Sequence, residues 1–92
     1  MIRTFRNRDT EDLFNERRVP KWNSIAVVAF RKLLLLDAAI RLGDLRIPPG
    51  NHLEALKGNR KGQYSIRVND QYRICFRWWE GAAYDVEITD YH

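Results

Sequence analysis

Three segments in the second half of the chain alternate apolar and polar residues, which is the pattern of a β-strand with one buried face. The segments are 63–68 (QYSIRV), 71–78 (QYRICFRW) and 83–88 (AYDVEI). In the last of them, we expect Tyr84, Val86 and Ile88 on the face opposite Asp85 and Glu87. The pattern predicts an antiparallel sheet with an apolar face and a polar face.

The connections between these segments set which residues meet across the sheet. A two-residue loop at 69–70 would place Ile66 opposite Arg73 and mix the two faces, whereas an odd loop or a bulge aligns Ile66 with Ile74. The same reasoning applies to the turn at residues 80–81. We therefore predict three-residue or bulged connections in both hairpins.

The aligned sheet carries a band of arginines on its polar face. Arg67 is expected opposite Arg73, and Arg77 lies further along the same strand as Arg73. Asp85 and Glu87 are expected to pair with the rim of this band.

The first residues predict a short edge strand and a short helix. Residues 1–5 (MIRTF) alternate and predict the strand. Thr10 suits the N-cap of the helix, because acids follow it in the first turn, where the helix dipole favours them. The Val19-Pro20 pair ends this helix.

A second, longer helix is predicted at residues 25–42, with Asn23 or Ser24 as its cap and Gly43 as its end. Its apolar positions cover more than one side, so that either the domain itself or a protein partner must bury them. The whole pattern predicts a single α+β domain over residues 1–92, in which two N-terminal helices pack on an antiparallel sheet.

Composition restricts the class of protein. The 92 residues are 45% hydrophobic, enough for one compact core, and no segment reaches the roughly 20 apolar residues of a membrane span. The N-terminal residues lack the apolar stretch of a signal peptide. The single Cys75 leaves no intrachain disulfide to form. We expect a cytoplasmic protein with no membrane partner.

Charge is distributed unevenly along the chain, whose net charge is +4. Basic residues dominate residues 57–77, where Asp70 is the lone acid, and acids dominate the residues that follow. Such segregation fits either a surface that binds a polyanion or a solvated sheet face with cross-strand ion pairs.

Two groups of residues suggest chemistry. In the loop at residues 57–62, glycines bracket basic residues and allow close approach to a phosphate. Asp90, Tyr91 and His92 are groups that transfer or orient protons. Cleavage of RNA by its own 2′-hydroxyl needs a base, an acid and cations. The loop and the arginine band supply the cations.

A metal site is the rival use of His52, Glu54, Asp90 and His92. These residues lack the spacing of zinc ligands. We therefore expect no metal and no other cofactor.

Three segments resemble the HigB toxins, the plasmid-maintenance killer branch of the RelE-like toxin superfamily: MIRTF, LEALKGNRKGQYSIRVNDQYRICFRW and GAAYDVEITDYH. The resemblance covers essentially the whole chain. It implies a small RelE-like fold and a metal-independent mRNA interferase that cuts mRNA in the A site of the 70S ribosome. It also implies a cognate HigA-like antitoxin with a helix-turn-helix domain, through which the complex binds operator DNA.

The resemblance also implies roles for individual residues. By position, Lys57 and Arg73 resemble the cations that bind the phosphate and stabilise the transition state. Asp90, Tyr91 and His92 resemble the C-terminal active-site group.

One position departs from the family pattern. Glu54 stands in LEALKG where some members have a histidine, and it is a candidate general base in that place. Two alternatives stay open: a non-catalytic module that binds RNA or the ribosome, and a protein that serves mainly as the regulatory partner of its antitoxin. The expected RNA contacts are Arg60, Lys61, Arg67 and Arg77.

Overall fold

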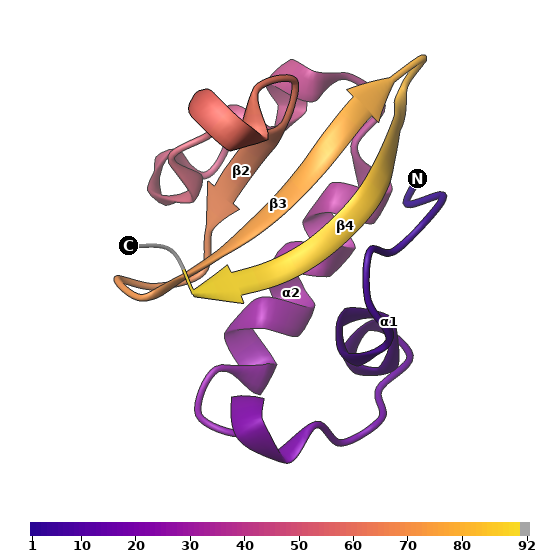
Figure 1. Ribbon diagram of the computed structural model, residues 1–92, viewed down its shortest axis with the longest axis vertical. Helices are drawn as coiled ribbons and strands as arrows, with labels where there is room; N and C mark the ends of the chain where they lie inside the picture. Colours follow the sequence, from indigo (N-terminus) through magenta and orange to yellow (C-terminus); the bar gives the residue numbers. More distant parts are fainter. Residues whose placement is uncertain (91–92) are drawn as a thin grey trace.

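The fold combines two helices with a four-stranded antiparallel sheet, and the computed structural model describes residues 1–90. The strands lie in the order β1-β2-β3-β4, and α2 runs behind one face of the sheet while α1 lies beside it near β4 (Figure 1). The predicted α+β architecture is confirmed. Its helices and strands are α1 (Arg8–Phe14), α2 (Ala26–Ala38), β1 (Glu54–Ala55), β2 (Tyr64–Arg67), β3 (Tyr72–Trp79) and β4 (Ala82–Asp90). Its 3₁₀ helices are η1 (Pro20–Trp22), η2 (Leu42–Arg46), η3 (Pro49–Asn51) and η4 (Gly58–Arg60).

The hairpin between β2 and β3 has the predicted register. Ile66 pairs with Ile74, and Arg67 pairs with Arg73. The Val68 amide still donates to the Tyr72 carbonyl oxygen at 3.0 Å, so the loop itself is the three residues 69–71. Asn69 holds it by accepting hydrogen bonds from the backbone N–H groups two and three positions later, at 2.9 and 2.7 Å. The faces of the two strands are therefore aligned, with isoleucines toward the helices and arginines away from them.

The hairpin between β3 and β4 has a shift of register, but the shift lies inside β4 and not, as predicted, at the connection. Its connection is a two-residue turn, Glu80-Gly81, with φ of 45° and 76°. Positive φ at both positions suits the twist of a tight hairpin, and glycine supplies one of them without strain. The prediction of a three-residue or bulged connection is therefore wrong at this turn.

A bulge inside β4 corrects the register instead, so that apolar residues of β3 and β4 lie on the same face of the sheet beyond it. Cys75 pairs with Glu87 but Arg77 pairs with Tyr84, so β4 has one residue more than β3 in this interval. Asp85 takes up the extra residue, with φ of 52°. Tyr84 consequently shares the face of Arg77, and its predicted grouping with Val86 and Ile88 is wrong.

The N-terminal segment follows the edge of β4. Ile2 and Phe5 form isolated parallel bridges with Ala83 and Val86, so the predicted edge strand is present as two bridges rather than as a continuous strand. The bulge at Asp85 separates the two bridges along β4.

Helix α1 begins three residues earlier than predicted, because Asn7 is its N-cap. The Asn7 side chain accepts a hydrogen bond from the Thr10 amide at 2.9 Å. Thr10 is fully buried, and its hydroxyl accepts a hydrogen bond from the Ile88 amide at 3.0 Å. Thr10, which was predicted to cap the helix, therefore links α1 to β4 instead.

Helix α2 ends five residues before Gly43. Ala39 is already extended, with ψ of 133°, and the Asp44 carboxylate accepts hydrogen bonds from the Ile40 and Arg41 amides, each at 3.0 Å. Asp44 thereby starts the 3₁₀ helix η2 in competition with further α-helix. At the other end, Ile25 is the N-cap without a side-chain hydrogen bond, so neither Asn23 nor Ser24 has the predicted role.

The core forms where α2 meets the sheet. Leu33 and Leu36 of α2 are fully buried, as are Ile74, Phe76 and Val86 of the sheet. The outer side of α2 is not covered, because Val27 is 70% exposed and Leu34 is 45% exposed. Within residues 1–90, no helix combines the length and apolar character needed to cross a membrane.

Candidate nucleic-acid interface

The sheet face turned away from α2, here called the polar face, carries the candidate site. One row of directly paired residues crosses all four strands: Glu54, Ser65, Cys75 and Glu87. A second row consists of Arg67, Arg73 and Thr89. Because paired residues share a face, the polar face brings the expected cation Arg73 next to the expected base Glu54.

Arg73 is held in place by several contacts. Its Nε donates to Ser65 Oγ at 2.7 Å, and its Nη2 donates to the carbonyl oxygen of His52 at 2.6 Å. The same Nη2 lies 3.7 Å from Glu54 Oε1. The Arg73 side chain is only 10% exposed, whereas that of Glu54 is 52% exposed. The site therefore pairs the buried Arg73 guanidinium, whose orientation is fixed, with the Glu54 carboxylate, which faces solvent.

A buried asparagine anchors the loop that leads to Glu54. Asn51 is fully buried, and its Nδ2 donates to the carbonyl oxygens of Leu45 and Ile47 at 3.1 and 3.3 Å. Its Oδ1 accepts a hydrogen bond from Lys32 of α2. Burial, with Arg31 and Arg67 nearby, lowers the pKa of Lys32. The sequence offered no signal for Asn51, because its partners are two backbone carbonyl groups and a lysine on a helix distant in sequence.

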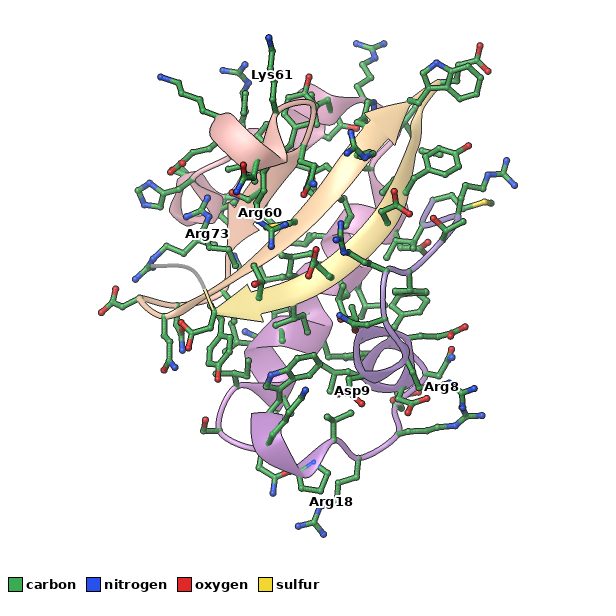
Figure 2. The ribbon with its side chains drawn as sticks, in the orientation of Figure 1. Arg8, Asp9, Arg18, Arg60, Lys61 and Arg73 are labelled. Atoms are coloured by element: carbon green, nitrogen blue, oxygen red, sulfur yellow. The ribbon has the colours of Figure 1, made fainter. Side chains whose placement is uncertain are left out.

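In the basic loop between β1 and β2, two lysines face solvent and one arginine binds the sheet. Lys57 and Lys61 are exposed and have no hydrogen bond or ion pair from their side chains to any residue in 1–90. Gly58 and Gly62, with φ of 61° and 92°, allow the loop to turn sharply on either side of η4. Figure 2 shows Lys61 projecting away from the sheet.

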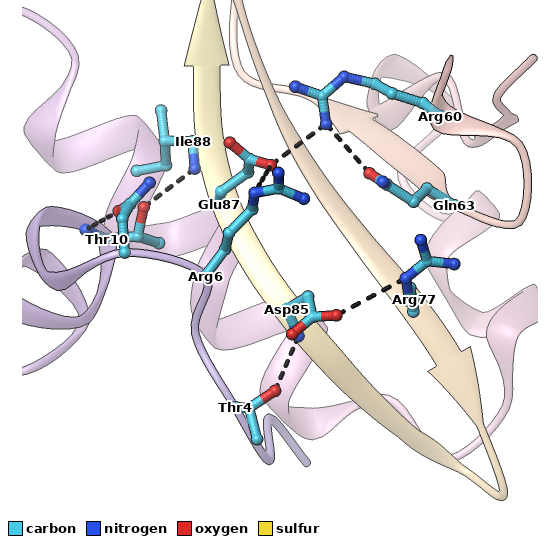
Figure 3. Close-up of polar contacts among 10 residues, drawn as sticks. Thr4, Arg6, Thr10, Arg60, Gln63, Arg77, Asp85, Glu87 and Ile88 are labelled. Carbon is cyan, nitrogen blue, oxygen red and sulfur yellow. Dashed lines mark hydrogen bonds and ion pairs between the residues drawn. The ribbon is translucent and has the colours of Figure 1, made fainter. Parts of the chain in front are cut away.

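Arg60 turns back toward the sheet instead of pointing into solvent. Its Nη1 donates to Gln63 Oε1 at 3.0 Å and to Glu87 Oε2 at 3.2 Å. The same Glu87 oxygen lies 3.3 Å from Arg6 Nε (Figure 3). Glu87 therefore ties the N-terminal segment and the basic loop to the middle of the polar face.

Glu87 is a site residue that sequence reasoning assigned to the wrong partners. It was expected to pair with the arginine band, but its partners are Arg6 and Arg60, and Asp85 pairs with Arg77 at 3.6 Å. Its exposed fraction is 9%. The arginine band of Arg67, Arg73 and Arg77 is less exposed to solvent than expected, because Arg73 is buried.

Glu87 and its two arginine partners, Arg6 and Arg60, form a cover over the middle of the polar face. Cys75, which pairs with Glu87 across the strands, lies beneath this cover and is fully buried. Burial raises the pKa of its thiol, and Glu87 raises it further, while Arg60 and Arg73 act in the opposite direction. Burial and the raised pKa both lower the reactivity expected of this thiol in the folded protein.

The variant Glu87→Gln should open the cover over Cys75. Loss of the carboxylate charge weakens the ion pairs with Arg6 and Arg60. We expect the free energy of unfolding to fall by about 1–2 kcal/mol. The effect is no larger because both arginines are partly exposed and solvent screens their charges. The pKa of Cys75 should fall as well, so iodoacetamide should alkylate the native protein faster. Asp85→Asn, which removes the exposed pair with Arg77, is the matched control. Equal alkylation rates in the two variants would contradict this role for Glu87.

Arg67 and Asp90 lie near one end of the sheet, where β2 ends and β3 begins. Arg67 forms an ion pair with Asp70. Asp90 pairs with Tyr72 in register, so strand alternation places its side chain on the face opposite Arg73, and it accepts a hydrogen bond from Gln71 Nε2 at 2.9 Å. Tyr91 and His92, the other two members of the expected active-site group, lie outside the described residues.

The rival metal site comprised His52, Glu54, Asp90 and His92, of which His92 lies outside the described residues. The part of the chain up to residue 90 holds no group of three or more histidine, cysteine or acidic residues arranged to bind a metal ion.

Comparison with known proteins places the chain in a family. Residues 3–92 match the HigB-like toxins, described as the RelE-like toxin of the type II toxin-antitoxin system HigB. Toxin HigB-1 of Vibrio cholerae is 55% identical over 73 residues, which cover 79% of this chain and 75% of that protein. Endoribonuclease HigB of Proteus vulgaris is 38% identical over 61 residues, 66% of this chain and 65% of that protein. An uncharacterized protein of Haemophilus influenzae is 47% identical over 51 residues, 55% of this chain and 50% of that protein. The chain therefore belongs to the HigB-like family of RelE-like toxins from type II toxin-antitoxin systems.

Proposed function

We propose that this toxin is a ribosome-dependent endoribonuclease that cuts mRNA in the A site of the 70S ribosome and thereby stops translation. The observation that carries the proposal is the Arg73–Glu54 pair on the polar face, beside a loop that presents Lys57 and Lys61 to solvent. The relative from Proteus vulgaris is named as an endoribonuclease. A fixed cation, an exposed carboxylate and exposed lysines supply the cations and one proton-transfer group of the set that RNA cleavage requires.

The proposed reaction uses the 2′-hydroxyl of the RNA as its nucleophile. A base removes the proton from O2′, the O2′–phosphorus bond forms, and the bond between phosphorus and the 5′-oxygen of the next nucleotide breaks. An acid protonates that leaving oxygen. The products are a 2′,3′-cyclic phosphate and a 5′-hydroxyl, and cationic side chains offset the negative charge that builds up on the phosphorane.

The cations have different duties in this scheme. Arg73 supplies a positive charge of fixed orientation, because its contacts to Ser65 and His52 hold the guanidinium plane. Lys57 binds a phosphate oxygen from the exposed loop, and Lys61 extends the cationic surface toward the RNA backbone. Tyr91 and His92, which follow Asp90 in the sequence, supply the second proton-transfer group.

Glu54 acts as the general base in this proposal, in the position where some family members have histidine. The isosteric variant Glu54→Gln should lower the rate of cleavage by about 100-fold, because the amide cannot accept the proton. Glu54→His should recover most of the activity at neutral pH. The comparison is made as single-turnover rates on programmed ribosomes. A Glu54→Gln protein as fast as the wild type would remove Glu54 from the mechanism.

Membership of the family supports a proposal about the biological setting. We propose that the cognate antitoxin is a HigA-like protein with a helix-turn-helix domain, and that this toxin contacts operator DNA only through the antitoxin complex. The proposed site of action is the bacterial cytoplasm, where translating ribosomes and mRNA are found.

The 2′-hydroxyl mechanism is tested with an mRNA that carries one 2′-deoxynucleotide at the cleaved position of the A-site codon. Unmodified mRNA should yield 2′,3′-cyclic phosphate and 5′-hydroxyl ends, and the deoxy mRNA should stay intact. Cleavage of the deoxy mRNA at the same bond would refute attack by the 2′-hydroxyl. Two intact messages on active ribosomes, with the protein bound, would favour a non-catalytic ribosome-binding module.

A further inference from the structure

A groove lies on the outside of the helical layer, between the end of α1 and the first half of α2. Its volume is about 300 Å³, enough to receive aliphatic or aromatic side chains. Its apolar lining consists of Leu13, Val19, Ala26, Val27 and Phe30. The polar face lies on the other side of the sheet from α2 (Figure 1), so this groove is separate from the candidate RNA site.

An apolar stripe continues from the groove along α2. Val27, Phe30 and Leu34 are spaced three and four residues apart and therefore share one side of the helix. Val27 is 70% exposed and Leu34 is 45% exposed. Apolar surface that continues a groove marks an interaction site more often than isolated exposed residues do.

The rim of the groove is basic. Arg18 belongs to the lining, and Figure 2 shows it projecting into solvent. Arg31 is exposed and follows Val27 by four residues on α2, so helical spacing places it next to the groove. Neither arginine has an ion pair with a residue in 1–90. Arg17 is engaged with Asp12 at 3.2 Å, and Glu16 is the acid on the lining. The surface thus combines an apolar floor with positive charges that lack an acidic partner within the described residues.

This combination favours a protein segment over RNA. An RNA backbone requires cations along its phosphates but gains little from an aliphatic floor, whereas an amphipathic helix places apolar side chains in a groove and its charges at the rim. Spacing of three and four residues along α2 suits a second helix packed against it.

We propose that the groove and the α2 stripe, together called the α2 groove, bind a helical segment of the cognate antitoxin that carries apolar anchors with carboxylates beside them. The proposal rests on membership of a type II toxin-antitoxin family, which provides a protein partner, and does not require the RNA cleavage chemistry. Val27 and Phe30 contact the anchors, and Arg18 and Arg31 pair with the carboxylates.

The test measures binding of the purified antitoxin encoded in the same operon to full-length toxin variants. Val27→Asp should weaken binding by roughly 30-fold or more, because it places a carboxylate on an apolar anchor site and beside acidic side chains. Arg18→Glu should weaken binding by about 5- to 10-fold and slow association most strongly at low salt. Ile47→Asp is the matched control, because Ile47 is 74% exposed and lies in the loop after η2, and its affinity should stay at the wild-type value.

Each variant is also checked for its thermal unfolding midpoint and for RNA cleavage, both of which should match the wild type. Wild-type affinity in Val27→Asp, with the fold intact, would overturn the proposal. So would a Val27→Asp variant that loses self-association of the toxin but binds antitoxin normally, because the occupant would then be a second copy of this chain. A toxin that binds antitoxin through the α2 groove but never cleaves RNA would refute the proposed function alone.

Discussion

Replacing Tyr91 and His92 together with alanine is expected to lower the rate of A-site cleavage by about 10⁴-fold and to abolish growth arrest. The size of the effect follows from the loss of general acid–base catalysis, which contributes about 10²–10⁴-fold for each group. The thermal unfolding midpoint should stay nearly unchanged, because within the described residues β3 already pairs with β4 along its whole length, from Trp79–Ala82 to Tyr72–Asp90.

The experiment compares single-turnover cleavage and thermal unfolding of the double variant with those of Trp79→Ala. Trp79 is 64% exposed and lies at the opposite end of β3 from the Tyr72–Asp90 pair, so its removal should change neither quantity. Growth arrest by the double variant at wild-type expression would show that Tyr91 and His92 are not part of the active site.

The second large effect is expected at Arg73, which joins the stability of the polar face to its chemistry. Arg73→Ala removes the donors to Ser65 and His52 and leaves Glu54 without its ion-pair partner. We expect the free energy of unfolding to fall by about 2–3 kcal/mol, because buried acceptors lose their partners. Cleavage should slow by about 10³-fold, the cost of losing a fixed electrostatic contact to the transition state.

Two further substitutions separate these roles. Arg73→Gln keeps amide donors but removes the charge, whereas Arg73→Lys keeps the charge but loses the planar set of donors. If the charge acts on the phosphorane, Arg73→Lys should cleave faster than Arg73→Gln even where urea unfolding shows equal stability. Equal cleavage rates at equal stability would assign Arg73 a structural role alone.

The sheet was largely predictable from the sequence, because a strand side chain has only two directions. The alternation in residues 63–78 required Ile66 to face Ile74 and Arg67 to face Arg73, and the structure has both pairs. The bulge at Asp85 was not located, since it depends on where the N-terminal segment and β3 meet the two sides of β4. Local alternation says that a correction of register is needed but not where it occurs.

The helix ends were less predictable because several residues compete for each cap. Asn7 and Thr10 both suit an N-cap, and tertiary contact decides between them, since the Thr10 hydroxyl accepts a hydrogen bond from β4. At the end of α2, Asp44 accepts backbone hydrogen bonds before Gly43 can end the helix. A distant strand decided the cap of α1, and a nearby carboxylate decided the end of α2.

The candidate site was predictable in part. Resemblance to the family singled out Glu54 and Arg73, and the structure brings them within 3.7 Å of each other. The role of Glu87 was missed because its partners, Arg6 and Arg60, come from the N-terminal segment and from a loop. Strand alternation predicted the face on which Glu87 lies but not the segments folded over that face.

The most direct test of the proposed function is primer extension on a defined mRNA held in programmed 70S ribosomes, with the same mRNA off the ribosome as control. Purified toxin should produce new ends confined to the A-site codon, and the free mRNA should remain whole. Intact message on active ribosomes would contradict the proposed endoribonuclease, and equal cleavage of the free mRNA would contradict its dependence on the ribosome.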